Sequence, residues 1–238
     1  MSLKDQLARL RVNSSRMYLD QFVHQAALSI PKGALVLDAG AGNCVYQHHF
    51  SQAVYESADF CQVDKEYGQI TYVCDLTEIP VEDARYDLVL CTQTLEHVPE
   101  PWRVLQEYYR VLKPGGSLWL SAPFYFEEHE LPYDFYRYTR YGMQHVVELA
   151  GFKIVRLEWL EGYYGAMSRQ FAVAFRSLSL HPRDYGGGLY GLAAACGMVV
   201  LKPFFGFLSI VFAHLDAHFK FEKAGHCKNY TVVAVKPS

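Results

Sequence analysis

The motif Asp38-Ala-Gly-Ala-Gly42 is the first part of the chain whose residue types could do chemistry, and it follows a short apolar run. Glycines at such a turn let the backbone approach a ligand closely, and a helix beginning beyond them offers free N–H groups. A dinucleotide fingerprint would need a third glycine at position 45, which is Val45. An aspartate before the glycines is unfavourable beside a pyrophosphate but suits a ligand with positive centres. We therefore predict a site for a cationic small molecule, lined by Asp38, Ala39, Gly40 and Gly42.

Two further carboxylates follow the next apolar runs. Asp64 ends the run 60–64, where a carboxylate can accept hydrogen bonds from both hydroxyls of a ribose. Asp75 and Leu76 follow the run 70–74, where a carboxylate can accept from an adenine amino group while an apolar neighbour covers the ring. Three carboxylates at three consecutive strand ends favour one shared ligand site over three unrelated surface acids.

The apolar runs indicate the elements that position these residues. Short runs separated by helical patterns predict an α/β fold with a parallel sheet covered on both faces. The expected strands are 34–38, 60–64, 70–74, 86–91, 117–121, 152–159 and 230–235. In such a sheet the ligand binds at the carboxyl ends of the strands.

Three helices are expected around this sheet. Apolar spacing predicts a leading helical region over 3–28 and a helix from about 101 to 112, ended by Lys113-Pro-Gly-Gly116. Thr139 is expected to cap a third helix, which would end at Gly151.

Composition limits the class of protein. The 238 residues are 51% hydrophobic, enough for a full core, and the formal charge of −3 gives no electrostatic footprint for nucleic acid. The six cysteines include no C-x-x-C pair, so we predict no metal site and a reducing compartment. Charges throughout the first thirty residues argue against a secretory signal. The expected location is the cytoplasm or the cytoplasmic face of a membrane.

A long insertion separates the last two expected strands. Residues 161–228 carry seven basic and four acidic residues, net +3, which leaves −6 for the remainder of the chain. Its stretch Leu189–Phe212 has 24 residues and one charge, Lys202, and reaches the length of a membrane-span candidate. A helical lid over the site and a face for a homodimer are the alternatives. The domains expected are thus 1–160 with 229–238, and 161–228.

Topology argues against a single membrane crossing. One crossing would separate the run 230–235 from the rest of the sheet. A central lysine costs roughly 2.5–3.5 kcal/mol on insertion scales, and Pro203 should break a helix. We therefore expect two short helices that pack as a lid beside the active-site mouth, with an apolar face that rests on anionic lipid.

Taken in order and spacing, several motifs resemble the class I S-adenosylmethionine-dependent methyltransferases, especially a large bacterial group with compact sheets. The motifs are Val36-Leu-Asp-Ala-Gly-Ala-Gly42, Val63-Asp64, Cys74-Asp75-Leu76, Tyr86–Val98, Leu112-Lys-Pro-Gly-Gly-Ser-Leu118 and Ala150-Gly-Phe152. The resemblance implies a Rossmann-like, seven-stranded, mostly parallel sheet whose antiparallel last strand inserts beside the sixth. The insertion before that strand is then helical.

The resemblance also implies a cofactor and its contacts. S-adenosylmethionine carries an ammonium and a sulfonium, and Asp38, Gly40 and Gly42 would line its methionine side. Asp64 would hold the ribose, Asp75 and Leu76 would meet the adenine, and Gln93 would flank the sulfonium.

The segment 124–139 after the fifth expected strand is rich in aromatic residues and is expected to meet the methyl acceptor. For a hydroxyl acceptor a general base would help, and His129 is the best-placed candidate because imidazole ordinarily titrates near neutrality. The alternative is a loop histidine that only hydrogen-bonds to the backbone. Arg137 either binds an anionic acceptor or pairs with Asp134.

Three functions can be compared on these residues. The favoured one is methyl transfer to a small or lipid-linked acceptor, with O-methylation preferred. A membrane-associated module that binds the cofactor without turnover is the alternative, although every expected cofactor carboxylate is present. A nicotinamide-dependent oxidoreductase is disfavoured by Asp38 and Val45.

Overall fold

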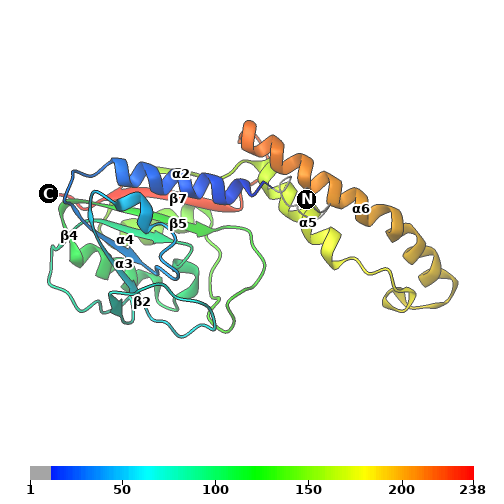
Figure 1. Ribbon diagram of the computed structural model, residues 1–238, viewed down its shortest axis with the longest axis horizontal. Coiled ribbons are helices and arrows are strands. Elements are labelled where there is room, and N and C mark those ends of the chain that lie inside the picture. Colours follow the sequence, from blue (N-terminus) through cyan, green and yellow to red (C-terminus); the bar gives the residue numbers. More distant parts are fainter. Residues whose placement is uncertain (1–11) are drawn as a thin grey trace. The chain divides into compact units, whose positions relative to one another are not determined.

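Residues 12–238 are described by the computed structural model, in which seven strands form one sheet (Figure 1). The strand order is β3-β2-β1-β4-β5-β7-β6, with β7 antiparallel to both β5 and β6 and the other pairs parallel. The strands are β1 (Leu35–Ala39), β2 (Val54–Asp59), β3 (Tyr72–Val73), β4 (Tyr86–Thr92), β5 (Leu112–Pro123), β6 (Lys153–Trp159) and β7 (Asn229–Val235). The predicted mostly parallel sheet with its inserted antiparallel last strand is confirmed.

The helices that accompany the sheet are α2 (Ser14–Leu28), α3 (Pro101–Val111) and α4 (Arg140–Leu149), with short 3₁₀ turns η1 (Gln47–Phe50) and η2 (Leu95–His97). The leading helix is confirmed over Ser14–Leu28, and the start of its expected range lies outside the described residues. Thr139 caps α4 as predicted, because its Oγ1 accepts a 3.0 Å hydrogen bond from the Gly142 amide.

Alternate residues of the central strands enter two separate cores, because successive side chains of a strand point to opposite faces. One core joins β1, β4 and β5 to α2, through residues such as Val36, Leu90, Phe22 and Val23. The other joins the same strands to α3 and α4, through residues such as Leu37, Val89, Leu105 and Met143. Figure 1 shows α2 on one side of the sheet, opposite α3 and α4.

The second strand differs from the prediction. It is β2 over Val54–Asp59, and the run 60–64 lies beyond it in a loop that bends from residue 63. The strand tolerates polar side chains because they have partners: Glu56 accepts from Tyr86 at the start of β4 and from Arg85 just before it. Periodicity of apolar residues therefore points to the wrong segment.

The turn expected at Lys113-Pro-Gly-Gly116 is also wrong, since these residues already belong to β5. Gly115 takes a φ of +79°, and its amide donates to the carbonyl of Lys236, just after β7. Gly116 accepts in turn from the Lys236 amide. Pairing with the chain end after β7 thus holds this segment extended.

The chain divides into two compact units. One holds the sheet and comprises residues 18–160 and 228–238; the other comprises residues 161–227 together with those before 18. The second unit contains α5 (Tyr163–Ser177), η3 (Pro182–Tyr185) and α6 (Gly188–His218), and α5 and α6 lie side by side (Figure 1).

The predicted pair of short helices in the insertion is wrong, because α6 is one helix of 31 residues that continues through Pro203. Packing along α5 supplies stabilisation that offsets the hydrogen bond missing at a proline. A lysine in an apolar helix is unfavourable unless its charge has a partner. The Lys202 ammonium has one, because it donates a 2.6 Å hydrogen bond to the Leu178 carbonyl just after α5.

Candidate functional site

The glycine turn after β1 contains two glycines with different requirements. Gly40 has a φ of +79°, and a Cβ there would lie 2.1 Å from Cγ2 of Thr94. Gly42 has a φ of +52°, but a Cβ there would meet no heavy atom within 4 Å. Gly40 is therefore required by packing against Thr94, whereas Gly42 borders open space that a ligand can use.

Asp38, near the end of β1, is 1% exposed. Its Oδ2 accepts a 2.6 Å hydrogen bond from the Tyr55 hydroxyl, while Oδ1 has no hydrogen-bond partner among the described residues. Burial raises the pKa of Asp38 to about 7, although the bond from Tyr55 acts in the opposite direction. An unpaired buried carboxylate oxygen is costly, and a cationic ligand group nearby would lower that cost.

The carboxylate at the end of β2 is Asp59, not the predicted Asp64. Asp59 is 6% exposed, its Oδ2 accepts a 2.9 Å hydrogen bond from the Gly42 amide, and its Oδ1 accepts from the Cys61 amide. Asp64 is exposed in the bend beyond the strand. A spacing signal was present: Asp59 follows Asp38 by 21 positions, closer than Asp64 to the ~20-residue separation of ribose-binding acids in dinucleotide folds.

Asp75 and Leu76 follow β3, as expected. Asp75 is exposed, and its Oδ1 accepts 2.8 Å hydrogen bonds from the amide and the hydroxyl of Thr77. Leu76 is 5% exposed and belongs to the core shared with α3 and α4. The aspartate therefore offers an oxygen at the surface, whereas the leucine mainly supports the turn from beneath.

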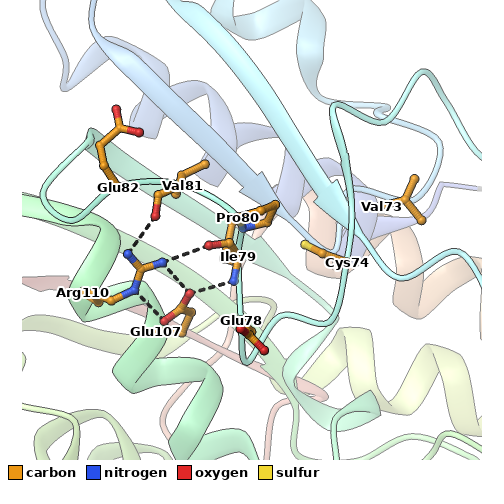
Figure 2. Close-up of a pocket in the computed structure, with 9 residues that line it drawn as sticks. All are labelled: Val73, Cys74, Glu78, Ile79, Pro80, Val81, Glu82, Glu107 and Arg110. Carbon is orange, nitrogen blue, oxygen red and sulfur yellow. Dashed lines mark hydrogen bonds and ion pairs between the residues drawn. The ribbon is translucent and has the colours of Figure 1, made fainter.

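A cavity of about 750 Å³ lies next to this turn, lined by Val73, Cys74, Glu78, Ile79, Pro80, Val81, Glu82, Glu107 and Arg110. Figure 2 shows Arg110 and Glu107 of α3 turned toward each other and toward the backbone of Ile79 and Val81. These polar groups satisfy one another, and none of the predicted cofactor residues lines the cavity. Its residues hold the loop after β3 onto α3, and the candidate site lies elsewhere.

Gln93 follows β4 directly and has a φ of +53°, which is uncommon for a residue with a side chain. Its amide donates to the Ser121 carbonyl at 2.9 Å, and its Nε2 donates to the Ser121 hydroxyl at 3.2 Å. These bonds to β5 fix the position of Gln93. Asp38 lies near the end of β1 and Gln93 follows β4, and because these strands are parallel neighbours, the two residues lie at the same edge of the sheet.

Glu96 and His97 are neighbours on η2, and Glu96 is the more deeply buried of the two. Glu96 is fully buried, neither carboxylate oxygen has a hydrogen-bond partner among the described residues, and burial raises its pKa to about 8. His97 Nδ1 donates to the Tyr133 carbonyl at 2.6 Å, so its Nε2 carries the lone pair, 3.8 Å from Oε1 of Glu96. Burial lowers the pKa of His97. At neutral pH both groups are therefore uncharged.

His129 lies in the loop after β5, with its ring edge-to-face on His97 at 4.6 Å between centroids. Its Nδ1 is 3.1 Å from the Glu127 carbonyl and 3.5 Å from Oδ2 of Asp134. The carbonyl can only accept a hydrogen bond, and so can the carboxylate when Asp134 is ionised. Nδ1 then carries the proton, and Nε2 is left as the basic nitrogen. One carboxylate oxygen of Glu96 and one ring nitrogen each of His97 and His129 lie within 4.8 Å of one another.

Asp134 is ionised and fixed. Arg137 donates to both of its oxygens, at 2.6 and 2.7 Å, and these bonds hold the pKa of Asp134 at about 2. Asp134 also accepts from the His129 amide at 2.8 Å. Of the two roles considered for Arg137, the structure shows the pairing with Asp134.

The loops after β2 and β5 contact each other at this edge of the sheet. Lys65 and Glu130 form an ion pair at 2.9 Å, and Phe60 packs edge-to-face on Tyr133 at 5.1 Å between centroids. Asp38 thus lies near the end of β1, and Gly40, Gly42, Asp75 and Gln93 follow parallel strands of the same sheet, with His129 in the loop after β5. The unpaired Asp38 oxygen and the open side of Gly42 fit a cationic cofactor.

Comparison with known proteins supports this assignment. Residues 33–120 match the family described as a methyltransferase domain. The ubiquinone biosynthesis O-methyltransferase of Coxiella burnetii is 31% identical over 130 residues, 50% of this chain and 53% of that protein. The chain therefore matches only about half the length of this relative.

Solved structures share the fold at lower identity. A [4+2]-cyclase, SpnF, has a TM-score of 0.56 at 19% identity, and the match covers 92% of this chain and 80% of the cyclase chain. A Burkholderia thailandensis 1,6-didemethyltoxoflavin-N1-methyltransferase, solved with its acceptor and S-adenosylhomocysteine, has a TM-score of 0.54 at 16% identity, with coverages of 99% and 83%. The fold hosts several chemistries, so the acceptor chemistry must be inferred from side chains.

Proposed function

We propose that the chain is a class I S-adenosylmethionine-dependent methyltransferase that methylates a hydroxyl of a small or lipid-linked acceptor. The observation that carries the proposal is the arrangement around His129. Its Nδ1 faces the Glu127 carbonyl and the ionised Asp134, and no hydrogen bond from the described residues reaches its Nε2. A histidine oriented in this way by a carboxylate is a suitable general base for a hydroxyl.

The cofactor supplies a methyl group on a positively charged sulfur. In the proposed site Asp38 would face its cationic part, and Gly42 would leave room for it. Asp59 would accept from the ribose hydroxyls in place of Asp64, because it lies beside the glycine turn. Asp75 would accept from the adenine amino group, and Gln93 would flank the sulfonium.

His129 would take the acceptor's proton at Nε2 as the new O–C bond forms and the C–S bond breaks, leaving S-adenosylhomocysteine. Alignment of nucleophile, methyl carbon and sulfur in a site closed to water should provide much of the rate. The Phe60–Tyr133 and Lys65–Glu130 contacts support such closure, because they join the two loops that flank the site.

Two relatives that match in sequence are named as O-methyltransferases of ubiquinone biosynthesis, which favours a phenolic hydroxyl as the acceptor. A reducing location fits the chain as well, since its six cysteines are all free. Binding of the cofactor without turnover is the second candidate, and the cyclase with the same fold shows why it must be tested.

Transfer of a labelled methyl group to a panel of phenols, quinols and their prenylated forms tests the proposal, alongside calorimetric titration with S-adenosylhomocysteine and with NAD. We expect S-adenosylhomocysteine to bind, NAD not to bind, and at least one phenolic acceptor to become labelled. Binding without labelling of any acceptor would favour the module without turnover.

His129→Ala tests the base, with His145→Ala on the exposed surface of α4 as the matched control. Loss of a general base lowers turnover by about 10²–10⁴-fold, and we expect a loss in this range for His129→Ala with unchanged cofactor affinity. The control should retain wild-type turnover. Wild-type turnover in His129→Ala would show that another group takes the proton.

A further inference from the structure

The helix α6 has two different faces. Its inner face packs within its own unit: Ser168 donates to the Ser209 carbonyl at 2.8 Å, and Phe171 stacks on Phe205 at 5.9 Å. Residues at helical spacings on the opposite side are exposed, with exposed fractions from 51% to 86%. This outer face of α6 comprises Leu189, Leu192, Val199, Val200, Phe204 and Phe207.

The outer face carries no charge. The only charged residue between Leu189 and Phe212 is Lys202, and its ammonium is bonded to the Leu178 carbonyl on the side of α5. The helix has a mean hydropathy of 1.9 over an 18-residue window, of which 6% is buried. A helix from the core of a soluble protein would be mostly buried, and an apolar face this large and exposed marks an interaction surface.

Topology excludes a single crossing of a bilayer by α6. The insertion leaves the sheet after β6 and returns as β7, and Trp159 pairs with Tyr230 at the ends of these strands. The Leu160 amide donates to the Asn229 carbonyl at 2.9 Å, so both ends of the insertion lie side by side. A crossing by α6 would require a second crossing by residues 163–187.

Residues 163–187 are too charged for that second crossing. They contain Arg169, Arg176, Arg183 and Asp184, and each charge at the centre of a bilayer costs several kcal/mol. The hairpin formed by α5 and α6 is therefore suited to lie in the interface between membrane and water, with the outer face of α6 toward the acyl chains.

The charges of the hairpin favour a lipid surface over a second copy of the chain. Residues 163–212 contain four basic residues and one acidic residue, net +3. Two copies would bring the same positive charges together, whereas each Lys or Arg near an anionic membrane contributes about 1 kcal/mol of attraction.

We propose that the outer face of α6 docks the protein on a bilayer that contains anionic lipid. The proposal stands independently of the methyl-transfer reaction, and its test needs no acceptor. A lipid-linked acceptor would then be met at the membrane where it resides.

Sedimentation of the full chain with vesicles tests the proposal. The vesicles contain either phosphatidylcholine alone or phosphatidylcholine with phosphatidylserine. We expect the wild type to pellet with the anionic vesicles, to pellet less with the neutral ones, and to be partly released by salt. Recovery of the wild type in the supernatant with both vesicles would overturn the proposal.

The variant Val200→Glu/Phe207→Glu places two charges on the outer face of α6, where the residues are 70% and 61% exposed. The control Tyr141→Glu/Leu149→Glu adds the same charges on α4, at residues 79% and 61% exposed. We expect vesicle partitioning to fall by about tenfold or more in the first variant, beyond the loss that added negative charge alone causes in the control. Equal losses in both variants would show that the outer face is not the contact.

Two further measurements separate membrane docking from self-association and misfolding. Cys196 is exposed and lies one helical turn from both Leu192 and Val200 of the outer face, so anionic vesicles should slow its labelling by a water-soluble maleimide. Size-exclusion chromatography should give the same monomeric volume for the wild type and for the Glu variant. A wild-type dimer that this variant converts to a monomer, with no vesicle effect on Cys196, would assign the face to a second copy.

Discussion

The Gly42 amide donates a 2.9 Å hydrogen bond to Oδ2 of Asp59, which joins the glycine turn after β1 to the carboxylate that ends β2. The same carboxylate accepts from the Cys61 amide through Oδ1. A carboxylate oxygen has two lone pairs, so each oxygen can accept one more hydrogen bond. Asp59 is therefore able to hold the glycine turn in place and still accept from two ribose hydroxyls.

Asp59→Asn should weaken binding of S-adenosylhomocysteine by about ten- to a hundredfold, because buried hydroxyls lose a charged acceptor at a cost of about 1–3 kcal/mol. Asparagine keeps an oxygen that can accept from the Gly42 amide, so the turn is expected to persist. Calorimetric titration measures the affinity. Asp64→Asn alters an exposed residue and should leave the affinity close to wild type. The reverse order of the two variants would restore Asp64 as the ribose ligand.

The sequence predicts a strand well wherever the strand is a continuous apolar run. β1, β4 and β7 are apolar runs because both of their faces are covered, and Thr139 has the side chain that a helix N-cap requires. β2 could not be found by this pattern, since its half-buried Glu56 and Tyr55 are stabilised by partners elsewhere in the chain: Arg85, just before β4, for one and Asp38 of β1 for the other. Such pairing depends on the fold and leaves no periodic signal.

Two features of the site and the insertion also depend on tertiary contacts. Glu96 belongs to a residue type that is almost never fully buried, yet η2 turns it into the core, where its pKa is raised. Pro203 and Lys202 predict a break in α6, but the helix continues because α5 packs along it and the Leu178 carbonyl accepts from the lysine. Local residue preferences are overridden in both cases by the packing of a neighbouring element.

Gly42→Ala should separate the requirements of the fold from those of the ligand. A residue with a side chain at φ +52° costs roughly 1–2 kcal/mol, but the added methyl meets no protein atom within 4 Å. We expect a modest fall in melting temperature and a loss of S-adenosylhomocysteine binding of at least about tenfold, because the methyl would occupy the space of the ligand.

Two other glycines calibrate that result. Gly33 has a φ of +80° and open space, so Gly33→Ala should lose similar stability while binding normally. Gly40→Ala should be the least stable of the three, because its methyl overlaps Thr94. Normal binding by Gly42→Ala would mean that the cofactor does not approach this turn.

Glu96→Gln should make the stability less dependent on pH above neutrality. The pKa of Glu96 is raised from 4.5 to about 8 by burial, so between these values the native state holds a proton that the unfolded state has released. Unfolding is then favoured as the pH rises, at up to about 1.4 kcal/mol per pH unit, until Glu96 ionises in the native state near pH 8. Glutamine has no proton to lose, and the slope should flatten.

Thermal melts from about pH 7 to pH 9 measure this effect. His97, whose pKa is lowered, titrates below that range, whereas Asp38, whose pKa is raised to about 7, contributes equally to the wild type and to Glu96→Gln, so the difference between the two proteins reports on Glu96. One kcal/mol corresponds to about 2–4 °C for a chain of this size, so the wild type should lose a few degrees more than Glu96→Gln across it. The exposed Glu148→Gln on α4 is the matched control and should follow the wild type. Parallel curves for the wild type and Glu96→Gln would show that Glu96 is already ionised in the native state at pH 7.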